Sequence, residues 1–90
     1  MVCIDDVVLF VKENLPTYAN ASNEEIRAVI DDHIKYGTIS IVFQKDVPVA
    51  LMRVNIDGPI AMICDFIIAE GHAMKPLMRM MTLELWERFP

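Results

Sequence analysis

Asp65 is the residue in this sequence best suited to proton transfer. It interrupts the apolar run MICDFII, where an unpaired carboxylate is costly or titrates at a raised pH. A carboxylate in such a place is a candidate general base, because it can take a proton from an attacking amine. The alternative is an ion pair with Arg53 or Arg79, and structural pairs outnumber catalytic carboxylates. The sequence leaves both interpretations open.

The polar segment that follows this strand is a candidate anion site. It reads EGHAMK over residues 70–75 and leads into a helix, whose first N–H groups attract negative charge. Lys75 and Arg79 lie one helical turn apart, within reach of an anion bound at the helix start. The alternative is a solvated basic edge that balances Glu84 and Glu87.

The two histidines and two cysteines are scattered along the chain. His72, in the turn, could donate to a phosphate, although a lone turn histidine more often faces solvent. We expect His33 to be a half-buried packing residue with a bonded ring nitrogen. Cys3 and Cys64 are expected to be free thiols, and no metal-ligand spacing is present, so no metal site is predicted.

Composition favours one compact acidic domain spanning residues 1–90. Hydrophobic residues make up 54% of the chain, and thirteen acids against eight bases give a net charge of −5. This charge disfavours nucleic acid as a ligand, because phosphate-backbone binding needs the opposite sign. No apolar run is long enough for a membrane span, and the N-terminus carries acids where a signal peptide needs bases. We therefore expect a cytoplasmic protein.

Two helices are predicted in the first half of the chain. Asp5 is the expected N-cap of the first, which must end before Pro16. The second begins with a capping box from Ser22 to Glu25, in which each residue satisfies a backbone donor of the other. Gly37 is expected to end this helix in the left-handed conformation.

A change of periodicity then predicts a sheet. Ile39, Ile41 and Phe43 alternate with polar residues, as in a half-buried strand, and residues 49–56 return the chain as a hairpin. Residues 60–69 are nearly continuous in apolar side chains, so we expect this third strand to be covered on both faces and the most buried of the sheet.

Helical spacing resumes after the third strand and continues to residue 89. The predicted class is therefore α+β: two N-terminal helices, a three-stranded antiparallel sheet and a C-terminal helix.

This order, and the residues that fill it, resemble the first half of the GNAT acetyltransferase fold. In that family two helices precede an antiparallel hairpin, and a central strand follows before the helix that binds coenzyme A. TISIVFQKDVPVALMRVNI resembles the hairpin, and MICDFIIAEGHAMKPLMRMMTLELWERF resembles the strand and coenzyme helix. Small phage-encoded members or relatives look closest, by their length and because the loop keeps one glycine and no arginine of the family's Arg/Gln-x-x-Gly-x-Gly/Ala motif.

The resemblance implies an acyl-coenzyme A binding protein or N-acetyltransferase, with acetyl-CoA as cofactor and Asp65 as catalytic residue. The backbone of Ile67 and Ile68 would then pair with the pantetheine arm. The pyrophosphate would face the residues that follow, which are Gly71, His72, Ala73, Met74 and Lys75.

The family continues into a fifth strand, and we expect residues 60–69 to have an open edge without it. A homodimer or another protein partner would cover that edge, and a truncation after the coenzyme-binding helix is also left open. The alternative function is a non-catalytic, phage-type binding or inhibitor module in the host cytoplasm, acting through its acidic helices or open sheet edge.

Overall fold

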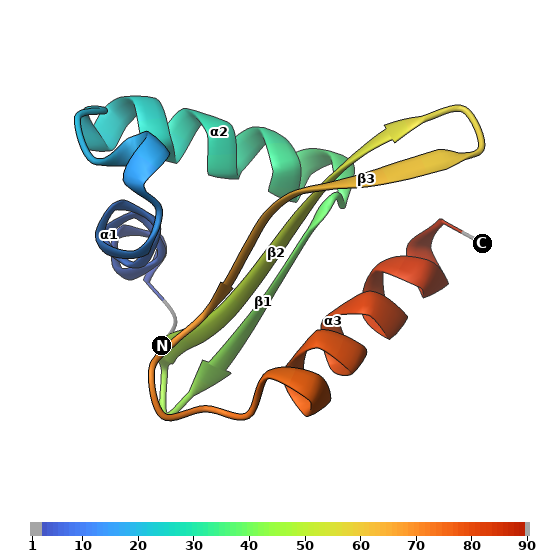
Figure 1. The fold of residues 1–90 in the computed structure, drawn as a ribbon. Helices are drawn as coiled ribbons and strands as arrows, with labels where there is room; N and C mark the ends of the chain where they lie inside the picture. The colour runs from blue at the N-terminus through green and yellow to red at the C-terminus, as the bar shows by residue number, and fades with distance from the viewer. Residues whose placement is uncertain (1–2, 90) are drawn as a thin grey trace.

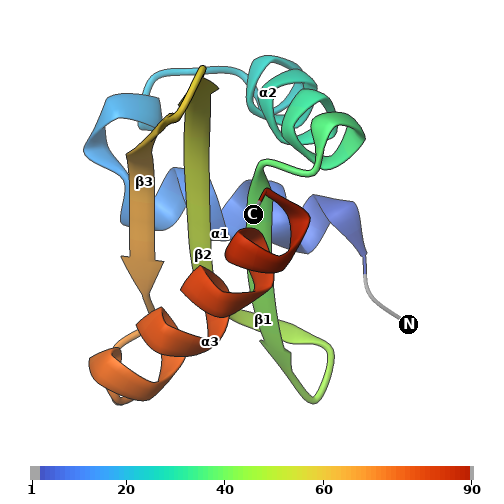
Figure 2. The same ribbon diagram turned by 90° about the vertical axis from the view of Figure 1, so that its right-hand side faces the viewer.

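The computed structural model describes residues 3–89 and has three layers. Two helices cover one face of the sheet and one helix crosses the other (Figures 1 and 2). This is the expected α+β class. The elements are α1 (Ile4–Asn14), η1 (Pro16–Tyr18), α2 (Asn23–Tyr36), β1 (Ile39–Gln44), β2 (Val47–Asp57), β3 (Ile60–Ile68) and α3 (Met74–Arg88).

Helix α1 begins earlier than its acidic residues suggested. Cys3 is the N-cap, with extended backbone and no side-chain cap bond, so the assignment of Asp5 as N-cap was wrong. Asp5 and Asp6 instead lie in the first turn, where their negative charge interacts favourably with the helix dipole. The helix ends at Asn14, just before Leu15 and Pro16, as expected.

Helix α2 has the predicted ends. Ser22 Oγ accepts a hydrogen bond from the Glu25 N–H at 3.1 Å. Gly37 closes the helix with φ of 71°, and the Gly37 and Thr38 N–H groups donate to Ile34 and His33 carbonyls. This left-handed position favours glycine, because a Cβ there would be strained.

The sheet is antiparallel, with strand order β1-β2-β3. Lys45 and Asp46 both have positive φ, which gives the β1–β2 turn the twist of a two-residue hairpin. Each face has its own core. Val7, Val11, Ile26 and Leu51 belong to the α1/α2 side. The α3 side contains Ala50, Met52, Val54, Met81 and Leu85.

The expectation that β3 is the most buried strand was wrong. Residues 60–64 are exposed, and only Ile67 of this strand is buried. The β2–β3 hairpin extends past the helices as an arm (Figure 1), so its apolar residues have no layer against them. The central strand β2 is the most buried instead, because a neighbour pairs with each of its edges.

Among residues 3–89, no helix combines the length and the apolar character needed to cross a bilayer.

Candidate functional site

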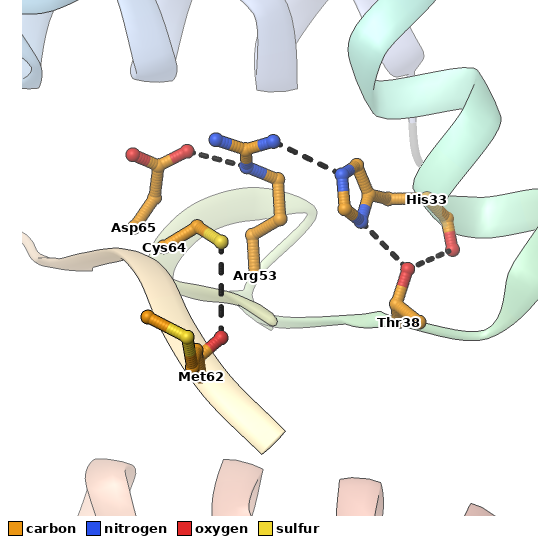
Figure 3. Close-up of polar contacts among 6 residues, drawn as sticks. All are labelled: His33, Thr38, Arg53, Met62, Cys64 and Asp65. Atoms are coloured by element: carbon orange, nitrogen blue, oxygen red, sulfur yellow. Dashed lines mark hydrogen bonds and ion pairs between the residues drawn. The ribbon is translucent and has the colours of Figure 1, made fainter. Parts of the chain in front are cut away.

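Asp65 is held in an ion pair with Arg53 between neighbouring strands. Arg53 Nε donates to Asp65 Oδ2 at 2.5 Å (Figure 3). The two side chains are 18% and 14% exposed. The strand register makes them direct cross-strand partners, with an irregularity at Cys64 that inserts one extra residue into β3. The predicted pairing with Arg53 is confirmed. The role of Asp65 as general base stays a prediction.

The other end of the guanidinium binds His33, which fixes the imidazole tautomer. Arg53 Nη1 lies 3.0 Å from His33 Nε2 and can only donate, so Nε2 must accept. His33 Nδ1 then carries the proton and donates to Thr38 Oγ1 at 2.6 Å, and Thr38 Oγ1 donates to the His33 carbonyl. The predicted half-buried, bonded histidine is confirmed. Burial and the adjacent Arg53 charge lower the pKa of His33.

Tyr18 completes this polar cluster from the α1–α2 connection. Burial, and then the neighbouring Asp65 carboxylate, raise the pKa of its phenol. Tyr18, Arg53 and Asp65 border a small cavity of about 10 Å³ whose other walls are apolar. A cavity of this size has room for about one water molecule and not for a substrate.

The lowered pKa of His33 makes stability depend on pH. In the unfolded chain His33 takes up a proton near pH 6.5, whereas in the folded chain it does so only at lower pH. The free energy of unfolding therefore falls as the pH drops below 6.5. The contribution is fully present above the unfolded pKa and is lost as pH falls through the folded pKa. Urea unfolding at about pH 7.5 and pH 5.5 should therefore show a larger loss in the natural chain than in His33→Gln. An equal loss in both proteins would contradict this.

The segment predicted to face a pyrophosphate forms a tight turn. Gly71 has φ of 87°, and the His72 N–H donates to the Ala69 carbonyl at 3.2 Å. His72 is half-buried, whereas Gly71, Ala73, Met74 and Lys75 are exposed. Ala73 is the N-cap of α3 and supplies no side-chain bond.

Lys75 and Arg79 lie together on one exposed flank of α3. They border a shallow depression together with Pro76, Met80 and Leu83. Glu84, one of the acids they were expected to balance, is bound by Arg88 and by Ser40 Oγ. Lys75 and Arg79 are both exposed, so an anion at the start of α3 could reach them.

The outer edge of β3 carries free backbone groups at alternating positions. The Ala69 N–H donates to the Val49 carbonyl, and the Val54 N–H donates in the opposite direction to the Thr38 carbonyl. Odd-numbered residues of β2 therefore bond β3. Their β3 partners include Ile67, so the backbone N–H and C=O of Ile67 bond β2, whereas those of Ile68 point away from β2. The residues whose backbone groups point away from β2 are Ala61, Ile63, Phe66 and Ile68; these are called the outward-facing residues.

An apolar groove of about 580 Å³ lies beside this edge. Helix α3 runs diagonally from the end of β3 toward β1 and leaves the arm uncovered (Figure 2). The arm forms one wall and the C-terminal half of α3 forms the other. The main lining residues are Val54, Ile56, Ile60, Ile63, Trp86 and Phe89.

The sequence interpretation missed this groove and the His33–Arg53 contact. Both the arm and α3 are rich in apolar residues, and this was the feature of the sequence that could have indicated a groove. Periodicity alone, however, does not show which of these apolar residues stay exposed to solvent. Within residues 3–89, no group of three or more histidine, cysteine or acidic side chains could hold a metal ion. Comparisons of the chain with protein-family models, curated proteins and solved structures found no match.

Proposed function

We propose that this chain is a protein-docking module that accepts an extended strand of another polypeptide along the outer edge of β3. The observation that carries the proposal is the coincidence of free backbone groups and an apolar groove at the same edge. An added strand gains main-chain hydrogen bonds from such an edge and places alternate side chains in the adjoining pocket.

The character of the edge supports docking. Natural edge strands are commonly protected by charged residues or by proline. Residues 60–64 are Ile, Ala, Met, Ile and Cys, and Ile60, Met62 and Ile63 are each more than half exposed. An uncharged, extended peptide with apolar residues at alternate positions matches this chemistry.

The polar cluster gives less support to a catalytic role. Asp65 is paired with Arg53, and the cavity beside it admits about one water molecule. A general base needs a reacting group within hydrogen-bond distance. Docking therefore uses features that face solvent, whereas proton transfer by Asp65 would first require the pair to open.

Coenzyme A binding is the second candidate. Ile68 offers outward backbone groups at the end of β3, and the chain then turns at Gly71 into the exposed start of α3 with Lys75 and Arg79. A strand edge followed by a helix N-terminus suits the amides and phosphates of an acyl coenzyme A. Pro76 removes one N–H from that first turn.

A two-arm NMR titration of the full chain separates these candidates. One arm adds a soluble peptide of alternating valine and threonine, and the other adds acetyl coenzyme A. Docking predicts that the peptide shifts the amides of Ala61, Ile63 and Phe66 and that Ile63→Lys abolishes the effect. Leu83→Lys is the matched control, because Leu83 and Ile63 are both 53% exposed.

The outcomes of the titration are distinct. Peptide shifts confined to α1 and α2, or shifts unaffected by Ile63→Lys, would reject docking at β3. Coenzyme shifts centred on Ile68 and residues 71–75 would favour the second candidate.

A further inference from the structure

We infer that the strand which completes this sheet is β3 of a second copy, paired antiparallel about a two-fold axis normal to the sheet. The inference rests on the proposed docking function and names its occupant. It would join two three-stranded sheets into a continuous sheet of six strands.

The two edges of the sheet differ in protection. On the β1 side, Arg88 Nη1 donates to the Ile39 and Gly37 carbonyls at 2.7 and 3.1 Å. The Thr38 carbonyl accepts from the Val54 N–H of β2. Because backbone groups of successive residues in a strand point to opposite sides, the Ile39 carbonyl faces away from β2. Arg88 therefore occupies acceptors that an added strand would need. On the β3 side no cationic side chain lies among residues 60–68.

When two copies of β3 are placed antiparallel, the outward-facing residues of one copy lie opposite outward-facing residues of the other. Ala61 would lie opposite Ile68 of the second copy, and Ile63 opposite Phe66. The extra residue at Cys64 makes this possible, since it shifts the outward positions from odd numbers (61 and 63) to even numbers (66 and 68) midway along the strand. A two-fold interface requires such self-complementarity, and it closes without open-ended growth.

The charge distribution also permits two copies to meet here. The only charge in β3 is Asp65, which is paired with Arg53. Four of the thirteen acids lie in the first turns of α1 and α2, which cover the face of the sheet opposite α3 (Figure 1), while Asp57 and Glu70 lie near the two ends of β3. Repulsion between two chains of net charge −5 is therefore weak at this edge, because solvent ions screen charges beyond about 8 Å.

The same register covers apolar surface outside the strand. Met74, Met78, Thr82 and Trp86 follow four-residue spacing and form one flank of α3, of which Thr82 and Trp86 border the groove. Reversal of β3 brings the arm of one copy beside the start of α3 in the other. Ile60 and Ile63 would then lie near Met74 and Met78, and all four side chains are at least 40% exposed in the single chain.

Sedimentation and thiol cross-linking of the full chain test this inference. At about 100 µM, above the micromolar Kd of weak interfaces of standard size, the chain should sediment at twice its monomer mass. Ile63→Lys should weaken association at least about 100-fold, because each dimer loses two buried isoleucines, whereas Leu83→Lys should leave it unchanged.

Cross-linking reports the register. The two Cys64 residues lie next to the proposed axis, and both cysteines of the chain are free and exposed. A short bifunctional maleimide should therefore link chains of the Cys3→Ser variant and not chains of Cys64→Ser. A monomer at about 100 µM, or a dimer linked only through Cys3, would overturn the inference. A monomer that still binds the valine–threonine peptide at Ile63 would overturn the dimer but leave the docking function supported. A monomer that does not bind the peptide would reject both the dimer and the docking function.

Discussion

Replacing Met81 by alanine is expected to lower the free energy of unfolding by about 3 kcal/mol. The Met81 side chain is 0% exposed and belongs to the core between α3 and β2, with Met52, Val54 and Leu85 around it. Truncation leaves a cavity that the surrounding strands can fill only in part. Urea denaturation of the two proteins, with far-ultraviolet circular dichroism as the signal, measures the difference.

Met78 provides the matched control on the same helix. It is 40% exposed, so Met78→Ala removes the same atoms from a site that water already reaches. We expect a loss below about 1 kcal/mol for a monomeric chain. Similar losses for both variants would mean that α3 does not pack on the sheet through Met81. The comparison is made at low protein concentration, because Met78 also lies in the proposed dimer interface.

Local chemistry explains which parts of the fold were predictable. Ser22, Glu25 and Gly37 act on backbone groups within a few residues of themselves, so the bounds of α2 followed from the sequence. The alternation in β1 was read as a half-buried strand, and this was wrong at Ser40, which is 1% exposed and donates to Glu84 of α3. The N-cap of α1 was misplaced because Asp5 suits both the cap and the first turn of a helix.

Features that depend on distant residues were not predictable in the same way. The apolar run in residues 60–68 suits both a covered strand and a bare docking edge, and only the direction of α3 across the sheet decides between them. The choice between Arg53 and Arg79 as the partner of Asp65 depended on the β2–β3 register, with its extra residue at Cys64. Periodicity does not specify this register, because a shift of one residue changes every cross-strand pair.

The Arg53–Asp65 pair yields the other large expected effect. Arg53→Met leaves Asp65, which is 14% exposed, without its ion-pair partner and also removes the donor to His33 Nε2. Loss of one partner of a largely buried pair should cost about 2–4 kcal/mol, somewhat less than for full burial. Arg53→Lys should be intermediate, because it keeps the charge but loses the planar fork that bridges Asp65 and His33. Urea unfolding at about pH 7.5, where His33 is neutral, gives these values.

The double variant Arg53→Met/Asp65→Leu distinguishes a structural pair from a reactive carboxylate. If the pair serves packing, removing both charges should recover most of the stability lost by Arg53→Met alone, since no charge is then buried without a partner. If the effects of Arg53→Met and Asp65→Leu simply add, the two side chains are not coupled. Asp65 would then not depend on Arg53 for its position, which would favour a role as a base. That result would support the coenzyme proposal, against which the Arg53–Asp65 ion pair now argues.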